Sequence, residues 1–168
     1  MIESFDEVMK DSSKGWPTFD DFKHGRVFID GNLVKRVEDL LKEHRCCLIR
    51  GAEGRGKSVL VRVVANNRPI EEKERISFFD VRESRNERID QIYKQFEAAV
   101  RESPEKTLVI VENTHTSFDE ITPKLVEFAN KHREASFIFT SRKILPEDEQ
   151  FLIEKTFEKW EKKNGVWT

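Results

Sequence analysis

Residues 51–58 have the types and spacing of a phosphate-binding loop, G-x-x-x-x-G-K-[ST]. Glycines let the backbone wrap so that its N–H groups face a chain of phosphates, and the start of a following helix adds positive potential. Lys57 stands where a lysine reaches the β- and γ-phosphates, and Ser58 stands where a hydroxyl ligates Mg²⁺. The residues predicted to hold the nucleotide are Gly51, Ala52, Glu53, Gly54, Arg55, Gly56, Lys57, Ser58 and Val59.

A carboxylate ends another apolar run. Residues 108–111 read Leu-Val-Ile-Val and are followed by Glu112, the usual place of an acid that holds Mg²⁺ through water beside such a loop. Ser58 and Glu112 are therefore the predicted metal-binding residues. Asn113 follows, where many hydrolases carry a second acid that orients water. Because an amide can hydrogen-bond water but cannot accept its proton at neutral pH, we expect slow or conditional hydrolysis.

A cationic residue, Arg142, follows shortly after the apolar run 135–140. If that strand lies between the loop strand and the acidic strand, Arg142 is placed to sense the γ-phosphate within the chain. The alternative is a surface arginine at a helix entry. His115 is interpreted as a packed loop histidine, and Asp80 as a structural or partner-facing residue. The candidate catalytic residues are Lys57, Glu112, Asn113 and Arg142.

Four short apolar runs, 45–50, 75–81, 107–112 and 135–140, are typical of parallel strands buried on both faces. Amphipathic stretches alternate with them, which predicts an α/β class: a three-layer P-loop NTPase domain with a mainly parallel sheet. The expected strand order is 51432, where strand 1 is the run over 45–50 and the others are numbered along the chain. The fifth strand is expected to be partial or absent after Gly165. In such sheets ligands bind at the carboxyl ends of the strands, where the polar residues above collect.

Helix signals fill the intervals between these runs. Residues 33–41 carry an apolar face, a capping box from Ser84 precedes a helix over 89–100, and a last helix is expected from Pro146 to Asn164. Residues 1–25 are expected to form an N-terminal extension packed on the core. Residues 26–168 are expected to form the P-loop domain, as an excised fragment of a longer protein or with a natural terminus.

The composition excludes several classes of protein. The chain has 168 residues, 37% hydrophobic and 37% charged, and its apolar runs are far shorter than the roughly 20 residues of a membrane helix. The formal net charge of −2 argues against a general electrostatic nucleic-acid binder. Cys46 and Cys47 are adjacent, which argues against a disulfide framework or a zinc site and indicates a reducing compartment, the cytoplasm.

Taken together, these motifs resemble the ATPase module of STAND proteins, signal-transduction ATPases within the AAA-like group of P-loop NTPases. The resemblance covers about residues 26–143 and rests on the segments 27–41, 47–58, 108–115 and 137–142. It implies that Val27 and Phe28 line an adenine pocket, and that Arg142 reads the γ-phosphate. Asp30 departs from the family pattern in the pocket segment, and Asn113 replaces the second acid.

The leading hypothesis is a switch ATPase that binds ATP or ADP with Mg²⁺ and changes its contacts with other domains or neighbouring protomers. One alternative is a small-molecule or nucleotide kinase, which would pair the strand over 107–111 directly with the loop strand. Another is a module that binds nucleotide without hydrolysing it. No membrane partner is expected.

Overall fold

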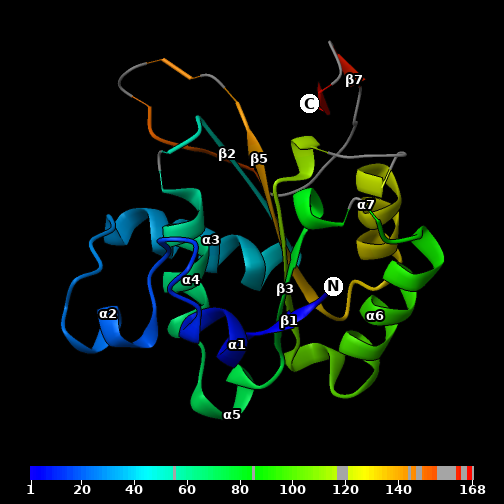
Figure 1. The fold of residues 1–168 in the computed structure, drawn as a ribbon, viewed down its shortest axis with the longest axis horizontal. Helices are drawn as coiled ribbons and strands as arrows, with labels where there is room; N and C mark the ends of the chain where they lie inside the picture. Colours follow the sequence, from blue (N-terminus) through cyan, green and yellow to red (C-terminus); the bar gives the residue numbers. More distant parts are fainter. Residues whose placement is uncertain are drawn as a thin grey trace.

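The chain folds around a central sheet that is covered by helices on both faces (Figure 1). The sheet strands are β1 (Glu3–Ser4), β2 (Cys46–Gly51), β3 (Ile76–Asp80), β4 (Leu108–Glu112), β5 (Ser136–Arg142) and β6 (Leu152–Glu154). A separate two-stranded ribbon pairs β7 (Lys162–Lys163) with β8 (Val166–Trp167). The computed structural model describes residues 1–54, 56–84, 86–116, 121–143, 145–146, 149–154, 162–163 and 166–167.

The six strands follow the order β1-β3-β4-β5-β2-β6. Strands β3, β4, β5 and β2 are parallel, and β5 lies between β2 and β4. Counted from β2 as strand 1, the four parallel strands follow the central part, 1432, of the predicted order 51432. The sheet differs from the full prediction because β1 adds an antiparallel strand beside β3. It differs also because the strand beside β2, β6, is antiparallel and precedes Gly165. Both differences lie at sheet edges, where pairing depends on distant segments rather than on local sequence.

The helices divide into two layers. Those described are α1 (Phe5–Lys10), α2 (Phe19–Lys23), α3 (Gly31–His44), α4 (Lys57–Asn66), α5 (Ile70–Lys73), α6 (Ile89–Arg101) and α7 (Ile121–Lys131), with short 3-10 helices η1 (Val81–Glu83), η2 (Pro104–Lys106) and η3 (Thr114–Thr116). In Figure 1, α1 to α5 lie on one side of the sheet, and α6 and α7 lie on the other. The three-layer arrangement agrees with the predicted class.

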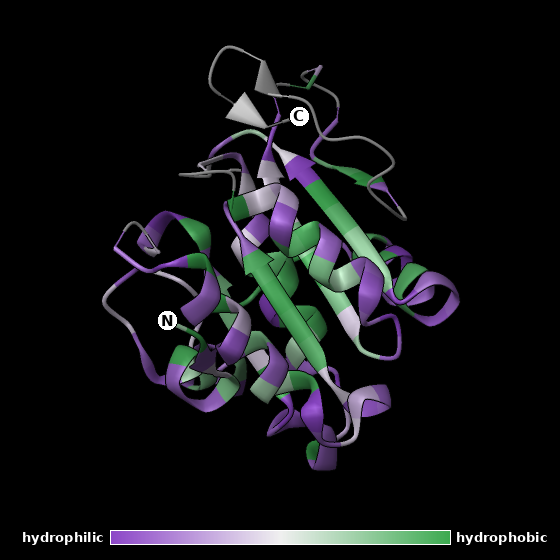
Figure 2. Ribbon diagram, turned by 90° about the vertical axis from the view of Figure 1, so that its right-hand side faces the viewer, coloured by the Kyte–Doolittle hydropathy of each residue, from purple (hydrophilic) through white to green (hydrophobic). Residues whose placement is uncertain are grey.

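The core consists of two apolar clusters, one on each face of the sheet. The first packs side chains of α1, α3 and α4 against the sheet, and the second packs those of α6 and α7. Figure 2 shows the central strands as mainly apolar and the helices as mixed, with polar residues along them. All five residues of β4 are buried, as expected of a parallel strand between two helical layers.

Local signals account for the predicted helices over 33–41 and 89–100, with a correction to the cap of the second. Asp30 caps α3, its side chain accepting the Asn32 N–H at 2.9 Å. Ser84 does not cap α6, because its hydroxyl donates to the Val81 carbonyl at 2.6 Å. Instead, the Arg88 N–H at the start of α6 donates to the Gln91 side chain at 3.2 Å.

The predicted last helix, from Pro146 to Asn164, is wrong in its first part. Residues 152–154 form β6, in which Ile153 is 4% exposed and pairs with β2. The apolar residues here have helical spacing, but the segment pairs with the open edge of β2 and is buried there instead. Residues 162–163, near the end of that predicted helix, form β7 instead, and residues 147–148, 155–161 and 164 lie outside the described residues.

Among the described residues, we find no helix with the length and apolarity needed to cross a membrane.

Candidate functional site

The phosphate-binding loop joins β2 to α4, as the sequence predicts. Two of its glycines have left-handed backbones, with φ of +75° at Gly54 and +97° at Gly56, a region that side chains with a Cβ rarely adopt. Gly51 is needed for a different reason. A Cβ there would lie 3.0 Å from the carbonyl oxygen of Gln150 and from the Phe151 ring. Arg55 lies outside the described residues.

Lys57 begins α4 and folds back over the loop. Its Nζ donates to the carbonyl oxygens of Gly51 at 2.7 Å and Ala52 at 2.9 Å. Burial lowers the pKa of the Lys57 ammonium, and the Arg142 charge lowers it further, against the opposite effect of Glu53. An anion at the loop would offset this cost, because it would give the buried ammonium a charged partner.

A hollow of about 820 Å³ opens beside the loop at the carboxyl edge of the sheet. Predicted site residues that line it are Glu53, Gly54, Gly56, Lys57, Ser58, Val59, Asn113 and Arg142. The structure therefore brings together groups that the sequence separates by up to 89 positions, counted from Glu53 to Arg142. This agrees with the rule that parallel sheets bind ligands at their carboxyl edge.

Six other residues line the hollow that sequence reasoning did not assign to it: Lys14, Trp16, Arg82, Glu83, His115 and Thr116. Arg82 and Glu83 follow β3, so the carboxyl-edge rule could have found them. Lys14 and Trp16 come from the N-terminal region, and no local signal places them here. Lys14 forms an ion pair with Glu83 across the rim.

Glu112 is not among the described residues that line this hollow. Its carboxylate is paired with Arg62 of α4, with 3.0 Å from Nη1 to Oε1 and 3.4 Å from Nη2 to Oε2. The two side chains are only 1% and 3% exposed. Arg62 Nη1 also donates to the Ser58 carbonyl at 2.9 Å, which ties the pair to the first turn of α4. For Glu112 to join a metal shell, its carboxylate would have to leave Arg62.

The N-terminal region covers this buried ion pair. The Arg62 guanidinium carbon lies 4.2 Å from the centre of the Trp16 ring and 5.0 Å from that of Phe78. A guanidinium between two aromatic faces gains cation–π attraction in a site with little solvent screening. Trp16 therefore borders both the Arg62–Glu112 pair and the phosphate-loop hollow.

Asn113 is held from two sides. Its backbone is left-handed, with φ of +60°, which asparagine tolerates better than most residues. Its N–H donates to the Thr140 hydroxyl at 3.1 Å, and its side-chain amide donates to Asp80 Oδ1 at 3.0 Å. Asp80, interpreted as structural from the sequence, is 8% exposed and also accepts the Arg82 N–H at 2.9 Å. The amide thus bridges β3 and β4 while it borders the hollow.

We expect Asn113→Asp to lower the free energy of unfolding by about 1–3 kcal/mol. The change removes the amide donor from Asp80 and places a second carboxylate beside it. Urea denaturation at neutral pH measures the effect, with Asn86→Asp as an exposed control that should change stability by under about 0.5 kcal/mol. Equal stability of Asn113→Asp and wild type would contradict the bridging role.

Arg142 lies at the end of β5 and lines the hollow, with its side chain about half exposed. Its guanidinium is 3.8 Å from a Glu53 carboxylate oxygen across the loop. The backbone N–H of Arg142 donates to Nδ1 of His115 at 3.1 Å. The segment after β4 and the end of β5 therefore both present a polar group to the same space as Lys57.

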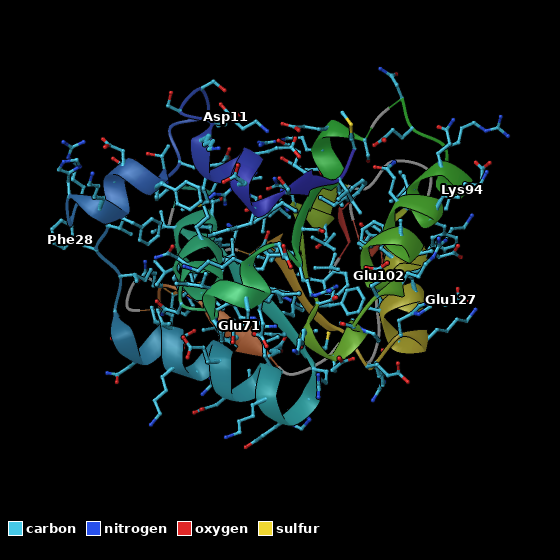
Figure 3. All side chains as sticks on the ribbon, turned by 90° about the horizontal axis from the view of Figure 1, so that it is seen from below. Asp11, Phe28, Glu71, Lys94, Glu102 and Glu127 are labelled. Carbon is cyan, nitrogen blue, oxygen red and sulfur yellow. The ribbon has the colours of Figure 1, made fainter. Side chains whose placement is uncertain are left out.

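Val27 and Phe28 are not among the described residues that line the hollow. Val27 is partly buried and packs against the core cluster that contains residues of α3 and α4. The Phe28 side chain is 86% exposed, and Figure 3 labels it at the outer edge of the molecule, on the chain between α2 and α3. Their role in an adenine pocket stays a prediction.

No protein-family model and no curated protein sequence matches this chain. Among solved structures, it is similar to C. elegans PCH-2, with a TM-score of 0.52 and 14% sequence identity. The match covers 80% of this chain but only 44% of that one. An identity this low carries information about the fold alone, and the likeness agrees with the three-layer α/β fold described above.

Proposed function

We propose that this chain binds ATP with Mg²⁺ and acts as a slow, conditional switch ATPase. The observation that carries the proposal is the shared hollow, where Lys57 and two left-handed glycines meet Arg142 from β5. Four cationic side chains line its described part, Lys14, Lys57, Arg82 and Arg142, against the two acidic side chains of Glu53 and Glu83. This excess of positive charge suits a polyphosphate.

The residues present fit the phosphates better than they fit a complete metal shell. The loop backbone and Lys57 would hold the phosphate chain, and the Ser58 hydroxyl would ligate Mg²⁺ together with phosphate oxygens and water. When bound, the ion would neutralise charge that develops on the phosphates. Glu112 would contribute to the metal shell only after its carboxylate leaves Arg62. This requirement is one physical reason to expect conditional activity.

The strand arrangement favours the switch ATPase over a kinase. A kinase of the type considered would pair β4 directly with β2, whereas β5 lies between them here. A module that binds nucleotide without hydrolysing it is the second candidate function. Asn113 favours this second candidate, because its amide, which donates to Asp80, cannot accept a proton from water.

Membership of the STAND class, and action through other domains or neighbouring protomers, belong to the same proposal. The match with the PCH-2 structure covers 44% of that chain. Residues of a neighbouring protomer could add the second cation that accelerates phosphoryl transfer in related enzymes by about 10³–10⁵.

We expect the isolated chain to turn over ATP well below the roughly 1–10³ s⁻¹ typical of enzymes. A phosphate-release assay with saturating ATP and Mg²⁺, run beside calorimetric titration of the same sample, measures turnover and binding separately. Binding with slow release supports the switch ATPase, and binding with no release supports the non-hydrolysing module. Turnover above about 1 s⁻¹ in the monomer would contradict the slow-hydrolysis account.

A further inference from the structure

His115 is fixed at the rim of the hollow by its neighbours. It lies in η3, directly after β4, and it lines the same space as Lys57 and Arg142. The Thr114 hydroxyl donates to the Thr140 carbonyl at 3.0 Å, and the Thr116 hydroxyl donates to the Asn113 carbonyl at 2.7 Å. These bonds hold the turn against β5, so the imidazole has a defined place rather than a free one.

The hydrogen bond from Arg142 fixes the tautomer of His115. Because Nδ1 accepts the Arg142 N–H at 3.1 Å, the proton of the neutral ring must be on Nε2. In the part of the chain that the structure describes, no hydrogen bond is made by Nε2. The ring therefore carries one committed acceptor and one N–H donor at the edge of a cationic hollow.

The surroundings keep this ring neutral. Burial lowers the pKa of His115 to about 4, and the positive charges of Lys57, Arg142 and Arg82 act in the same direction, against Glu53. The charged groups that act on the ring come from the loop, α4, η1 and β5. A neutral ring can donate a hydrogen bond without the cost of burying another charge.

We propose that His115 binds the terminal phosphate of a nucleoside triphosphate in the hollow, donating from Nε2–H to a phosphate oxygen while its Nδ1 accepts the backbone N–H of Arg142. The inference rests on the proposed nucleotide-binding function and adds a residue to it. Loop amides cradle the inner phosphates and Lys57 reaches the outer ones. The rim formed by His115 and Arg142 is then the part of the site that distinguishes a triphosphate from a diphosphate.

Two substitutions separate the two ring nitrogens. In His115→Asn the side-chain oxygen can replace Nδ1 as acceptor for the Arg142 N–H, but the Nε2–H donor is lost. In His115→Gln the longer amide can place an N–H near Nε2. Calorimetric titrations of each variant with ATP·Mg and with ADP·Mg are compared with those of wild type and of His44→Asn, a change at an exposed position of α3.

We expect His115→Asn to weaken ATP affinity by about three- to tenfold, the effect of one hydrogen bond, and to change ADP affinity less than about twofold. His115→Gln and His44→Asn should stay within about threefold of wild type for both nucleotides. Equal losses for ATP and ADP in His115→Asn, or no loss for either, would overturn the role of His115. Absence of nucleotide binding in wild type would instead overturn the proposed function.

A measurement on the wild-type chain needs no variant to fold. Imidazole resonances followed by NMR over a pH series report the pKa of His115 with and without nucleotide. A phosphate oxygen at Nε2 favours the protonated ring, so the pKa should rise from about 4 when ATP is added and rise less with ADP. An unchanged pKa in a sample shown to bind ATP would contradict the contact.

Discussion

Replacing Arg62 with methionine is expected to lower the free energy of unfolding by about 3–5 kcal/mol. The change leaves the Glu112 carboxylate, 3% exposed, without its charged partner. It also removes the hydrogen bond to the Ser58 carbonyl and the guanidinium that packs between Trp16 and Phe78. Urea denaturation at neutral pH, followed by circular dichroism, measures the loss.

Two further proteins make the Arg62 result interpretable. The double variant Arg62→Met, Glu112→Leu removes both charges and should recover much of the lost stability, because an apolar pair needs no compensation. Arg101→Met, at an exposed position of α6, should change stability by under about 0.5 kcal/mol. Wild-type stability in Arg62→Met would show that the buried pair does not hold the phosphate-loop helix to β4.

The second large effect is expected on binding. Lys57→Ala should weaken ATP·Mg affinity at least about tenfold, or about 1.4 kcal/mol, because it removes the ammonium that the loop holds at 2.7 Å and 2.9 Å from its own carbonyls. That ammonium is partly desolvated already, so a phosphate gains a strong partner there. Isothermal titration calorimetry measures the difference.

The control for Lys57→Ala is Lys131→Ala. Lys131 is on α7, where its side chain is 69% exposed and pairs only with Glu127 of the same helix among its described ion-pair partners. Its loss should leave ATP affinity unchanged within about twofold. Equal affinities of Lys57→Ala and wild type would remove the phosphate-binding interpretation of the loop.

Features that depend on neighbours in sequence could be predicted. The loop over 51–58 and the apolar run before it define β2 and α4, because a phosphate-binding turn needs specific residue types in a fixed order. The buried runs define β3, β4 and β5, since strands covered on both faces are apolar throughout. The carboxyl-edge rule then places Asn113 and Arg142 beside Lys57.

Features that depend on distant pairing could not be predicted. Arg62 has no pattern that marks it as the partner of Glu112, 50 residues away, and it is buried on a helix whose neighbouring positions are buried too. The stretch around Ile153 has helical spacing but pairs with β2, because an open strand edge offers both hydrogen bonds and burial. Trp16 reaches Arg62 only because β1 and α1 bring the N-terminal region against the sheet.

The central claim is that ATP·Mg binds at the hollow formed by the loop, η3 and the end of β5. Backbone amide chemical-shift mapping of the labelled wild-type chain tests it most directly. Shifts should concentrate at Gly54, Gly56 and Lys57 and at His115 and Arg142, with saturation at one binding constant. A second hollow of about 500 Å³ lies at the amino ends of the parallel strands and is lined by Arg45 and Arg68 among others. It serves as the internal comparison. Shifts confined to that second hollow, with none at the loop, would contradict the account.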